Sequence, residues 1–528
     1  MSFTSLNFLL FVALAVIIYF LVPLKHRWLV LLTASYAFYL ISSPESFIFM
    51  LITTVSTFYG GLAMGKCDEQ MEEKVRAAGD SLDRAGKKAL KAEAKAKKKR
   101  LMILILVFNF AILAFMKYFR VYLKTLSEIF DAEWLRFNAG ILIPLGISFY
   151  TFQAMSYIID LNRGKYKPDK NLFKFALFVS WFPLIVQGPI SRYDQLAMQL
   201  QEGHEFDYTR IKFGGQLIMW GFFKKLVIAD RIAILANTVF DNYQDYRGMY
   251  LIIGALAYTI QIYADFSGGI DIARGVSQIF GIELENNFER PYFSRSLTEF
   301  WRRWHITLGH WCRDYIFYPI SLSKTFGKLG RNSRRILGDR VGKLFPVIVA
   351  QLATFLTIGI WHGAQFKYIA YGLYQAFFIV GGMLLEPYLL KLNELLHINT
   401  EAGTWKLFQM LRTFCIVVFG RFFSRAHRFR AAVHMMKASF VFNPAILFNG
   451  KIYTLGLNER DFSLLITCLL LWLCISIAQE KGYSIREVLS RQNTLFRWAI
   501  YLIGFISIVI FGVYGVGYDA STFIYRTF

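Results

Sequence analysis

The sequence predicts an all-α polytopic membrane protein, and three observations lead to this fold class. Hydrophobic residues make up 55% of the 528 residues and aromatic residues 17%, whereas charged residues contribute only 18%. The apolar residues are gathered into blocks of about 17–25 residues, the length that a helix needs to cross a hydrocarbon core of about 30 Å. Lysine and arginine lie mainly between these blocks. Water therefore cannot be the main solvent of the chain, and membrane-spanning helices are the expected elements.

The apolar blocks predict about 11–13 membrane helices in contact with membrane lipids. In order along the chain they lie at residues 5–24, 28–42, 46–64, 101–116, 139–160, 172–190, 213–240, 249–268, 345–361, 367–389, 406–423, 462–479 and 496–516. The first block has no basic residues before it and no convincing cleavage site before Lys25, so we expect a retained helix and not a signal peptide. The sixth block contains Pro183 and Pro189, so we expect it to be broken or re-entrant.

Basic residues follow the first, third and fifth blocks, which gives these three loops the same parity. They include Lys25 and Arg27, the stretch Lys66–Arg100, and four basic residues between 163 and 170. Because cytoplasmic loops are enriched in lysine and arginine, these loops are predicted to be cytoplasmic and the N-terminus to lie outside. The net charge of +23 is therefore attributed to membrane topology, and no nucleic-acid partner is expected.

The stretch Lys66–Arg100 carries 12 basic against 7 acidic residues and is rich in strong helix formers. We expect a basic cytoplasmic arm that is helical. It could dock a partner or bind lipid headgroups, or it could be a solvated helical hairpin that only fixes the topology, which is the favoured interpretation.

The cysteines give no sign of a disulfide framework or of a metal site. All five are scattered along the chain, at Cys67, Cys312, Cys415, Cys468 and Cys474. His305, His310 and Cys312 have the spacing H-x4-H-x-C, which matches no common zinc pattern. The sequence therefore predicts no metal site.

A first polar cluster occupies Ser294–Pro319, a segment too charged to span lipid alone. Glu299 and Arg303 have the i, i+4 spacing of a helical ion pair. Trp301 and His305 are expected on the same helical neighbourhood, so that one face would present an ion pair and an imidazole beside an indole. The segment is predicted to lie at the membrane interface or to line a water-filled funnel.

A second cluster surrounds His362, which follows an almost uncharged apolar run and is flanked by Trp361 and Gly363. The small glycine is expected to let a thin substrate approach the imidazole. A reaction that activates a hydroxyl group needs a base whose pKa lies near neutrality, and histidine has the suitable unperturbed pKa. The alternative is a structural histidine that packs beside an apolar face.

Several motifs agree with one known family. They are LLTASYAFY at 31–39, ILIPLGISFYTFQAMSYIIDLNRG at 141–164, FPLIVQGPISR at 182–192, GFFKKLVIADR at 221–231, YADFSGGIDIARG at 263–275, WRRWHITLGHWCRDY at 301–315, GIWHG at 359–363 and YGLY at 371–374. Together they resemble the membrane-bound O-acyltransferase (MBOAT) family, in the branch of bacterial alginate, cellulose and peptidoglycan O-acetyltransferases. The similarity extends from residue 5 to about residue 390.

This resemblance implies a ring of tilted helices around a central tunnel, with His362 as the catalytic histidine and His305 as the second one. Residues 101–390 would form the catalytic core, after N-terminal membrane helices at 1–65 and the basic arm at 66–100, and before C-terminal membrane helices at 391–528. The expected substrate-binding residues are Gln153, Gln187, Trp301, Arg302, Arg303, Asp314, Trp361 and Gly363.

The resemblance further implies transfer of an acetyl group from acetyl-CoA or another cytoplasmic thioester, with no bound cofactor. The acceptor would be a hydroxyl of an extracytoplasmic partner protein or of an exported polysaccharide, at the cytoplasmic membrane of a bacterium. One alternative is a D-alanyl transfer protein of teichoic-acid modification, which takes its donor from a carrier protein. Another is a transporter for a lipid-linked sugar, in which Arg302, Arg303 and Asp271 would hold the substrate; no internal repeat supports it.

Overall fold

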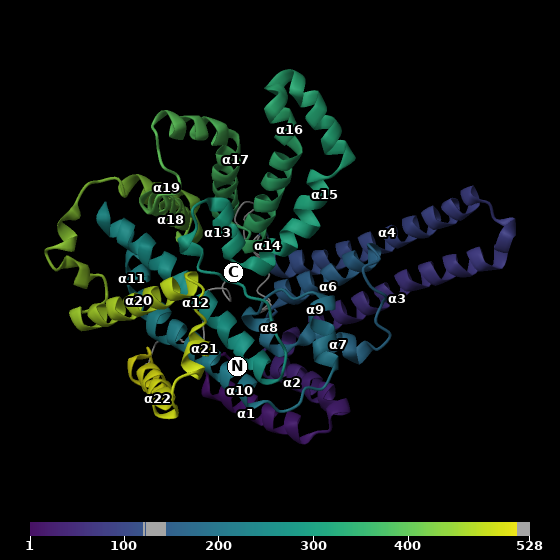
Figure 1. The fold of residues 1–528 in the computed structure, drawn as a ribbon, viewed down its shortest axis with the longest axis horizontal. Coiled ribbons are helices and arrows are strands. Elements are labelled where there is room, and N and C mark those ends of the chain that lie inside the picture. Colours follow the sequence, from purple (N-terminus) through teal and green to yellow (C-terminus); the bar gives the residue numbers. More distant parts are fainter. Residues whose placement is uncertain (120–121, 123–143, 515–528) are drawn as a thin grey trace, which may run out of the picture. The chain divides into compact units, whose positions relative to one another are not determined.

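The computed structural model describes residues 1–119, 122 and 144–514, and most of these residues are helical (Figure 1). The chain forms two compact units. The first contains residues 1–215 and 273–285, and the second contains residues 216–272 and the chain from residue 286 onward. The sequence predicted a different division of the chain, into N-terminal helices, a basic arm, a catalytic core and C-terminal helices. That division is based on function, and it stays a prediction.

Among the described residues, eight helices are long and apolar enough to cross a membrane. They are α3 (Phe47–Ala78), α4 (Arg84–Ala114), α12 (Met249–Ile279), α16 (Lys324–His362), α17 (Phe366–Leu395), α18 (Gly403–Arg425), α20 (Glu459–Glu480) and α22 (Thr494–Phe511). Each contains one of the apolar blocks predicted from the sequence, or most of it. The predicted class, an all-α polytopic membrane protein, is therefore confirmed.

The other predicted blocks form shorter or interrupted helices. Two of them give α1 (Leu6–Leu21) and α2 (Arg27–Ser42), each of 16 residues. The block at 213–240 is divided into α10 (Tyr208–Phe222), a π-helical turn (Phe223–Ala229) and α11 (Asp230–Asp241). Part of the block at 139–160 lies outside the described residues, and its remainder forms α6 (Ile147–Asn162).

The expected break in the block at 172–190 is present in the first unit. Helix α7 (Leu172–Ser180) ends and α8 (Phe182–Gln187) begins on either side of Trp181, whose backbone is not helical. The Trp181 indole is fully buried, and its N–H donates to the Ser277 hydroxyl at 3.1 Å. A proline at the second position of α8 is compatible with a helix start, so the sequence restarts the helix there.

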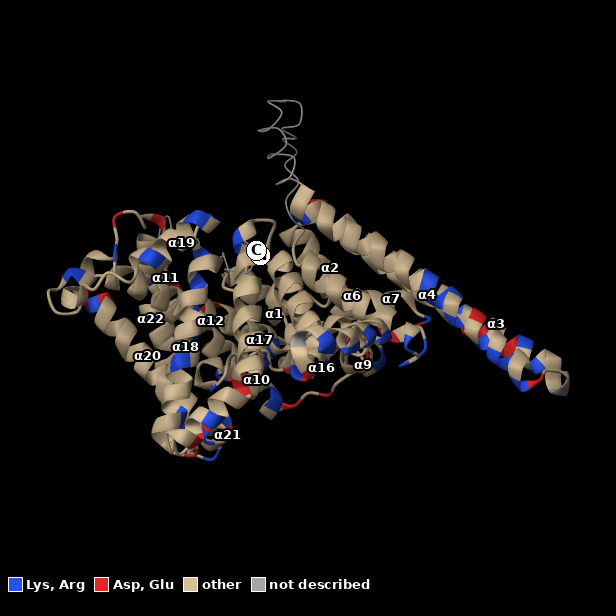
Figure 2. Ribbon diagram, turned by 90° about the horizontal axis from the view of Figure 1, so that it is seen from above, with Lys and Arg blue, Asp and Glu red and all other residues tan. Residues whose placement is uncertain are grey.

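Helices α3 and α4 form the basic arm expected at Lys66–Arg100, and Figure 2 shows its charged outer half. The chain reverses at Gly79, whose φ of 51° suits glycine. Between residues 84 and 100, α4 carries nine basic side chains and one acidic one, whereas the facing part of α3 is richer in acid. The Lys98 ammonium lies 2.5 Å from the Asp68 carboxylate, an ion pair between the two helices. The helical part of the prediction is confirmed.

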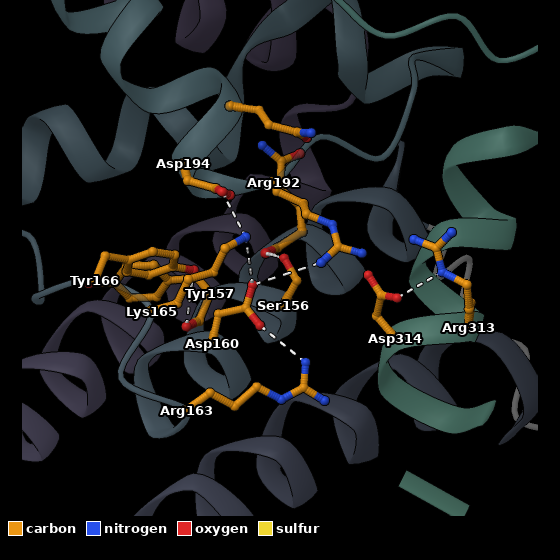
Figure 3. Close-up of polar contacts among 12 residues, drawn as sticks. Ser156, Tyr157, Asp160, Arg163, Lys165, Tyr166, Arg192, Asp194, Arg313 and Asp314 are labelled. Carbon is orange, nitrogen blue, oxygen red and sulfur yellow. Dashed lines mark hydrogen bonds and ion pairs between the residues drawn. The ribbon is translucent and has the colours of Figure 1, made fainter. Parts of the chain in front are cut away.

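The basic loop after α6 is organised around one buried carboxylate, that of Asp160 (Figure 3). The guanidinium groups of Arg163 and Arg192 lie 3.4 and 3.9 Å from it, and the Lys165 ammonium lies 3.8 Å away. Lys165 also pairs at 2.7 Å with Asp194 in α9 (Tyr193–Gln201). This network holds the loop to α9 in the first unit.

In the second unit, close packing of α16 against α17 positions the site described below. A methyl group at Gly359 would lie 2.6 Å from the Tyr368 carbonyl oxygen, and one at Gly372 would lie 2.3 Å from that of Phe355. Small residues thus let the two backbones approach closely, as in many membrane helix pairs. Helix α16 has one non-helical residue, Gly338, which separates its basic first part from its apolar second part.

The remaining helices of the second unit are short. They are α13 (Leu297–Arg303), α14 (Ile306–Cys312), α15 (Tyr318–Ser321), α19 (Phe429–Ala438) and α21 (Ile485–Ser490).

Candidate functional site

The segment around His305 folds as two short helices and not as one continuous helix. Helix α13 ends at Arg303, Trp304 is extended, and His305 has φ 47° and ψ 54°, in the left-handed region. Trp301 and His305 therefore do not share a helical face, and that prediction was wrong. A left-handed conformation is uncommon for a residue other than glycine, and such local strain is often found at functional sites.

A neighbouring stretch of chain holds this turn in place. Phe288 and Trp304 form an isolated antiparallel bridge. On either side of it, the Glu289 N–H donates to the Arg303 carbonyl and the Ile306 N–H donates to the Asn287 carbonyl, both at 3.0 Å. These backbone contacts replace the helical hydrogen bonds that a continuous helix would have made.

The imidazole of His305 is fixed by the Asn287 side chain. The Asn287 amide oxygen accepts from the Thr307 backbone N–H at 3.0 Å and from the Thr307 hydroxyl at 2.9 Å, and it lies 3.2 Å from His305 Nδ1. Because an amide oxygen only accepts, Nδ1 carries the proton and Nε2 carries the lone pair.

Burial keeps this imidazole neutral. His305 is only 2% exposed. Burial lowers the pKa of His305 to about 3, and the nearby His362 acts in the same direction. His305 therefore stays uncharged throughout the physiological pH range.

His362 is the last residue of α16, and its ring is oriented by its own helix. Its Nδ1 lies 2.7 Å from the Ile358 carbonyl oxygen, one turn earlier. A carbonyl oxygen only accepts, so Nδ1 carries the hydrogen, and in the neutral ring Nε2 carries the lone pair. His362 is only partly buried, in contrast to His305.

The two imidazoles both lie against the Trp361 ring and line one cavity. The centroid of the Trp361 ring lies 5.9 Å from that of His305 and 4.9 Å from that of His362. The cavity contains about 410 Å³ of space not filled by atoms, counting its opening. Its lining residues are Ile262, Trp301, Trp304, His305, Leu308, His362, Tyr368, Tyr371, Arg421 and Ser424.

The expected substrate-binding residues near the cavity have different surroundings. Trp301 lines the cavity, and its indole N–H donates to the Gln375 amide oxygen at 3.2 Å. The space beside Gly363 is filled by a protein side chain, because a methyl group there would lie 2.6 Å from the Tyr368 ring. The glycine is thus required for the packing of Tyr368, a cavity residue.

The predicted charged residues of the first cluster lie outside the cavity lining. Arg303 pairs with Glu299 at 2.8 Å, as its spacing predicted, and also with Glu480 at 2.8 Å. Arg302 is exposed. Asp314 accepts from the Arg313 guanidinium at 2.9 Å (Figure 3). Their assignment to substrate binding stays a prediction.

Comparison with known proteins identifies the family of the chain. Residues 168–332 match the family model of MBOAT, the membrane-bound O-acyltransferase family. Over 447 residues the chain is 34% identical to the probable alginate O-acetylase AlgI of Pseudomonas aeruginosa, an alignment that covers 84% of this chain and 75% of that relative. The chain belongs to the membrane-bound O-acyltransferase family. It is therefore an acyltransferase, and its helices make it a multi-pass membrane protein.

Two other relatives of this MBOAT acyltransferase align over a smaller part of the chain. The peptidoglycan O-acetyltransferase of Helicobacter pylori is 30% identical over 291 residues, covering 50% of this chain and 52% of the relative. The teichoic acid D-alanyltransferase of Bacillus subtilis is 32% identical over 247 residues, covering 44% of this chain and 57% of the relative. All three relatives are named as enzymes that transfer acyl groups, so the transporter alternative is not supported.

Two expected substrate-binding residues of the acyltransferase belong to the first unit. Gln153 is buried, and its amide donates to the Phe178 carbonyl at 2.6 Å. Gln187 is fully buried, and its amide has no hydrogen-bond partner among the described residues. Their role in substrate binding stays a prediction.

Sequence reasoning missed one charged residue of the cavity, Arg421 in α18. Arg421 is 2% exposed, and its guanidinium lies 4.9 Å from the centroid of the Trp304 ring. The available signal was an arginine within a predicted membrane segment, which is by default a functional hypothesis. In the described part of the chain, no group of three or more His, Cys, Asp or Glu residues is placed to hold a metal ion.

Proposed function

We propose that this acyltransferase moves an acetyl group from a cytoplasmic thioester, with acetyl-CoA as the donor, to a hydroxyl group on the other side of the membrane. The acceptor is an exported polysaccharide or a Ser of an extracytoplasmic partner protein, and the membrane is the cytoplasmic membrane of a bacterium. The alginate and peptidoglycan O-acetyltransferases among the relatives support an acetyl group and a polysaccharide acceptor. In this proposal the donor is a substrate, and donor and acceptor meet in a tunnel that includes the cavity.

The orientation of His362 carries the proposal. Its Nδ1–H is engaged by the Ile358 carbonyl at 2.7 Å, so the neutral ring presents Nε2 as a base. A base positioned in this way contributes about 10²–10⁴-fold to a rate. His305 supplies a second imidazole to the same cavity. Its neutral Nε2 can only accept a hydrogen bond, so we assign His305 a positioning role beside the base and leave the single proton of the acceptor hydroxyl to His362.

The reaction then proceeds by addition and elimination at the thioester carbonyl. The acceptor hydroxyl gives its proton to His362 Nε2 while its oxygen bonds to the carbonyl carbon. When the carbonyl re-forms, the carbon–sulfur bond breaks, and the leaving thiolate takes the proton from the His362 imidazolium. The histidine ends in its starting state, and holding donor and acceptor in line supplies the remaining acceleration.

A transfer assay tests the proposal directly. The purified protein, in lipid nanodiscs, is given acetyl-CoA labelled in its acetyl group, and alginate or peptidoglycan strands are added in separate arms. We expect the wild-type protein to label one of these polymers and His362→Ala to lower the rate about 10²–10⁴-fold. Labelling at an unchanged rate by His362→Ala contradicts the assignment of the base.

A D-alanyl transferase is the second candidate, because the teichoic acid D-alanyltransferase of Bacillus subtilis is also a relative. Its shorter coverage, 44% of this chain against 84% for the alginate enzyme, favours acetyl transfer. A third arm of the assay, with D-alanyl thioester on a small carrier protein, separates the two. Label transferred only in that arm would replace acetyl transfer by D-alanyl transfer.

A further inference from the structure

The cavity contains a permanent positive charge to which the proposed reaction gives no role so far. Of the ten described residues that line the cavity, Arg421 alone has a side chain that is always charged. The arginine is 2% exposed, and it lies in α18, a helix apolar enough to cross a membrane. A charge at such a position is costly, so its presence indicates function.

Contacts with Trp304 and Tyr371 help to hold the guanidinium group in a fixed position. One face lies over the Trp304 ring at 4.9 Å, and Nη1 donates to the Tyr371 hydroxyl at 3.3 Å. Trp304 is itself held by its backbone bridge to Phe288, and Tyr371 is 3% exposed. The planar guanidinium is therefore pre-oriented at the cavity wall, where little reorganisation is needed during a reaction.

The fixed positive charge of Arg421 complements the negative charge that develops during the reaction. His305 is neutral, since burial lowers the pKa of its imidazole to about 3. When a hydroxyl oxygen adds to a thioester carbonyl, negative charge develops on the carbonyl oxygen. A fixed cation beside this oxygen stabilises the transition state more than the uncharged ground state, which is what accelerates a reaction.

We propose that Arg421 stabilises the oxyanion of the tetrahedral intermediate, an inference that rests on the proposed function. As the acceptor oxygen bonds to the carbonyl carbon, the carbonyl electron pair moves to its oxygen, and the Arg421 N–H groups donate to that oxygen. When the carbon–sulfur bond breaks, the pair returns to re-form the carbonyl. Arg421 keeps all its protons throughout, and proton transfer is left to His362.

Variants of Arg421 test this role through the split between kcat and KM. We expect Arg421→Gln to lower kcat about 10²–10³-fold, the usual effect of losing one oxyanion donor, with little change in the KM for the donor. Arg421→Lys keeps the charge but loses the planar geometry, so its kcat should lie between those of wild type and Arg421→Gln. Guanidinium ion at a non-denaturing concentration should restore part of the activity of Arg421→Ala, which leaves a hole of matching shape.

Arg425 provides the matched control, since it lies one turn further along the same helix. Its guanidinium pairs with Asp241 at 3.0 Å and with the Asn237 side chain at 2.8 Å, and it does not line the cavity. Arg425→Gln removes the same charge from α18, and we expect its kcat to stay close to wild type. A folded Arg421→Gln with the kcat of Arg425→Gln overturns the inference.

A measurement on the wild-type protein covers the case in which no Arg421 variant folds. Acetonyl-CoA, a ketone analogue of acetyl-CoA, is labelled with ¹³C at its carbonyl and bound at a concentration that inhibits transfer. A guanidinium beside the carbonyl oxygen should move its infrared stretch to lower frequency than in water, and an unmoved or higher frequency overturns the inference.

The outcomes also separate this inference from the proposed function. If transfer requires His362 and Arg421 proves dispensable, only the role of Arg421 fails. If the wild-type protein labels neither polymer from acetyl-CoA, the proposed function itself fails.

Discussion

The same dipeptide, Trp-His, occurs twice at the cavity, and its two copies have different backbones. Trp304–His305 lies between two short helices, with the histidine in the left-handed region. Trp361–His362 forms the end of α16, with the histidine ring bonded to its own helix. Both rings have the same tautomer. In each of them Nδ1 faces an oxygen atom that can only accept a hydrogen bond, so Nδ1 carries the hydrogen.

The difference between the two copies lies in what surrounds each ring. His305 is 2% exposed, and its partner is a side chain from another segment, Asn287, which also binds Thr307. His362 is partly buried, and its orientation needs only the preceding helical turn. The comparison teaches that the same dipeptide can have unequal surroundings: a buried imidazole held by a distant side chain in one copy, and a partly buried imidazole held by its own helix in the other, to which we assign the role of the base.

The largest expected effect separates these two roles. We expect His362→Gln to lower the kcat of acyl transfer about 10²–10⁴-fold while the protein stays folded, because only the proposed base is removed. His305→Gln should lower kcat less and reduce stability more, since its ring is part of a buried network. Both variants are measured for transfer in nanodiscs and for thermal unfolding. A larger loss of kcat in His305→Gln would reverse the assignment of the base.

The hydrogen bonds of Asn287 around the first Trp-His copy, Trp304–His305, should contribute strongly to the stability of the protein. Asn287→Ala removes the acceptor of three donors, from His305 and from the backbone and hydroxyl of Thr307. Buried donors left unsatisfied cost about 1–3 kcal/mol each, so we expect a loss of at least about 3 kcal/mol of unfolding free energy.

Chemical denaturation of Asn287→Ala measures this loss, with Asn237→Ala as the control. Asn237 is exposed and accepts one hydrogen bond, from Arg425, so its replacement should change stability by no more than about 0.5 kcal/mol. Equal effects of the two substitutions would mean that the Asn287 network does not hold the turn.

Local patterns predicted some parts of this site correctly. The i, i+4 spacing of Glu299 and Arg303 predicted their ion pair, and eight apolar blocks predicted the eight long helices. His362 was singled out because it ends an apolar run, and it does line the cavity, but its catalytic role stays a prediction. Each of these features depends on residues close together in the sequence, and helical periodicity places them reliably.

Other parts of the site depend on contacts between distant segments and could not be predicted. A continuous helix through Trp301 and His305 has the right local pattern, but the bridge between Phe288 and Trp304 replaces it with a turn. Arg421 comes to the cavity from a helix more than a hundred residues after His305, and no spacing rule connects the two. Tertiary contacts of this kind override local propensity.

The buried state of His305 also predicts how stability depends on pH. The pKa of an imidazole is about 6.5 in an unfolded chain, whereas burial lowers the pKa of His305 to about 3 in the folded protein. Between these values the unfolded state binds a proton that the folded state does not, so stability falls as the pH falls through this window. The slope contributed by this residue is at most about 1.4 kcal/mol per pH unit.

Unfolding of wild type and His305→Gln at about pH 7 and about pH 5 isolates this contribution, because other titrating groups affect both proteins. We expect the wild-type protein to lose more stability on acidification than the variant. Equal losses of stability in the two proteins would show that the His305 ring is hydrated. His305 would then differ less from His362 in its burial.

The smallest expected effect concerns the charges beside the first copy. Glu299→Gln removes one of the two carboxylates that pair with Arg303, which is partly exposed, and Glu480 keeps the other pair at 2.8 Å. Exposed or partly exposed ion pairs contribute about 0–1 kcal/mol, so stability should change little, and the KM for the donor should not change. Kinetics with varied donor concentration check the second point. A clear rise in KM would mean that this charged group contacts the donor, as the sequence predicted for Arg302 and Arg303. The surface that binds the donor would then extend beyond the cavity to the charges beside Trp304–His305.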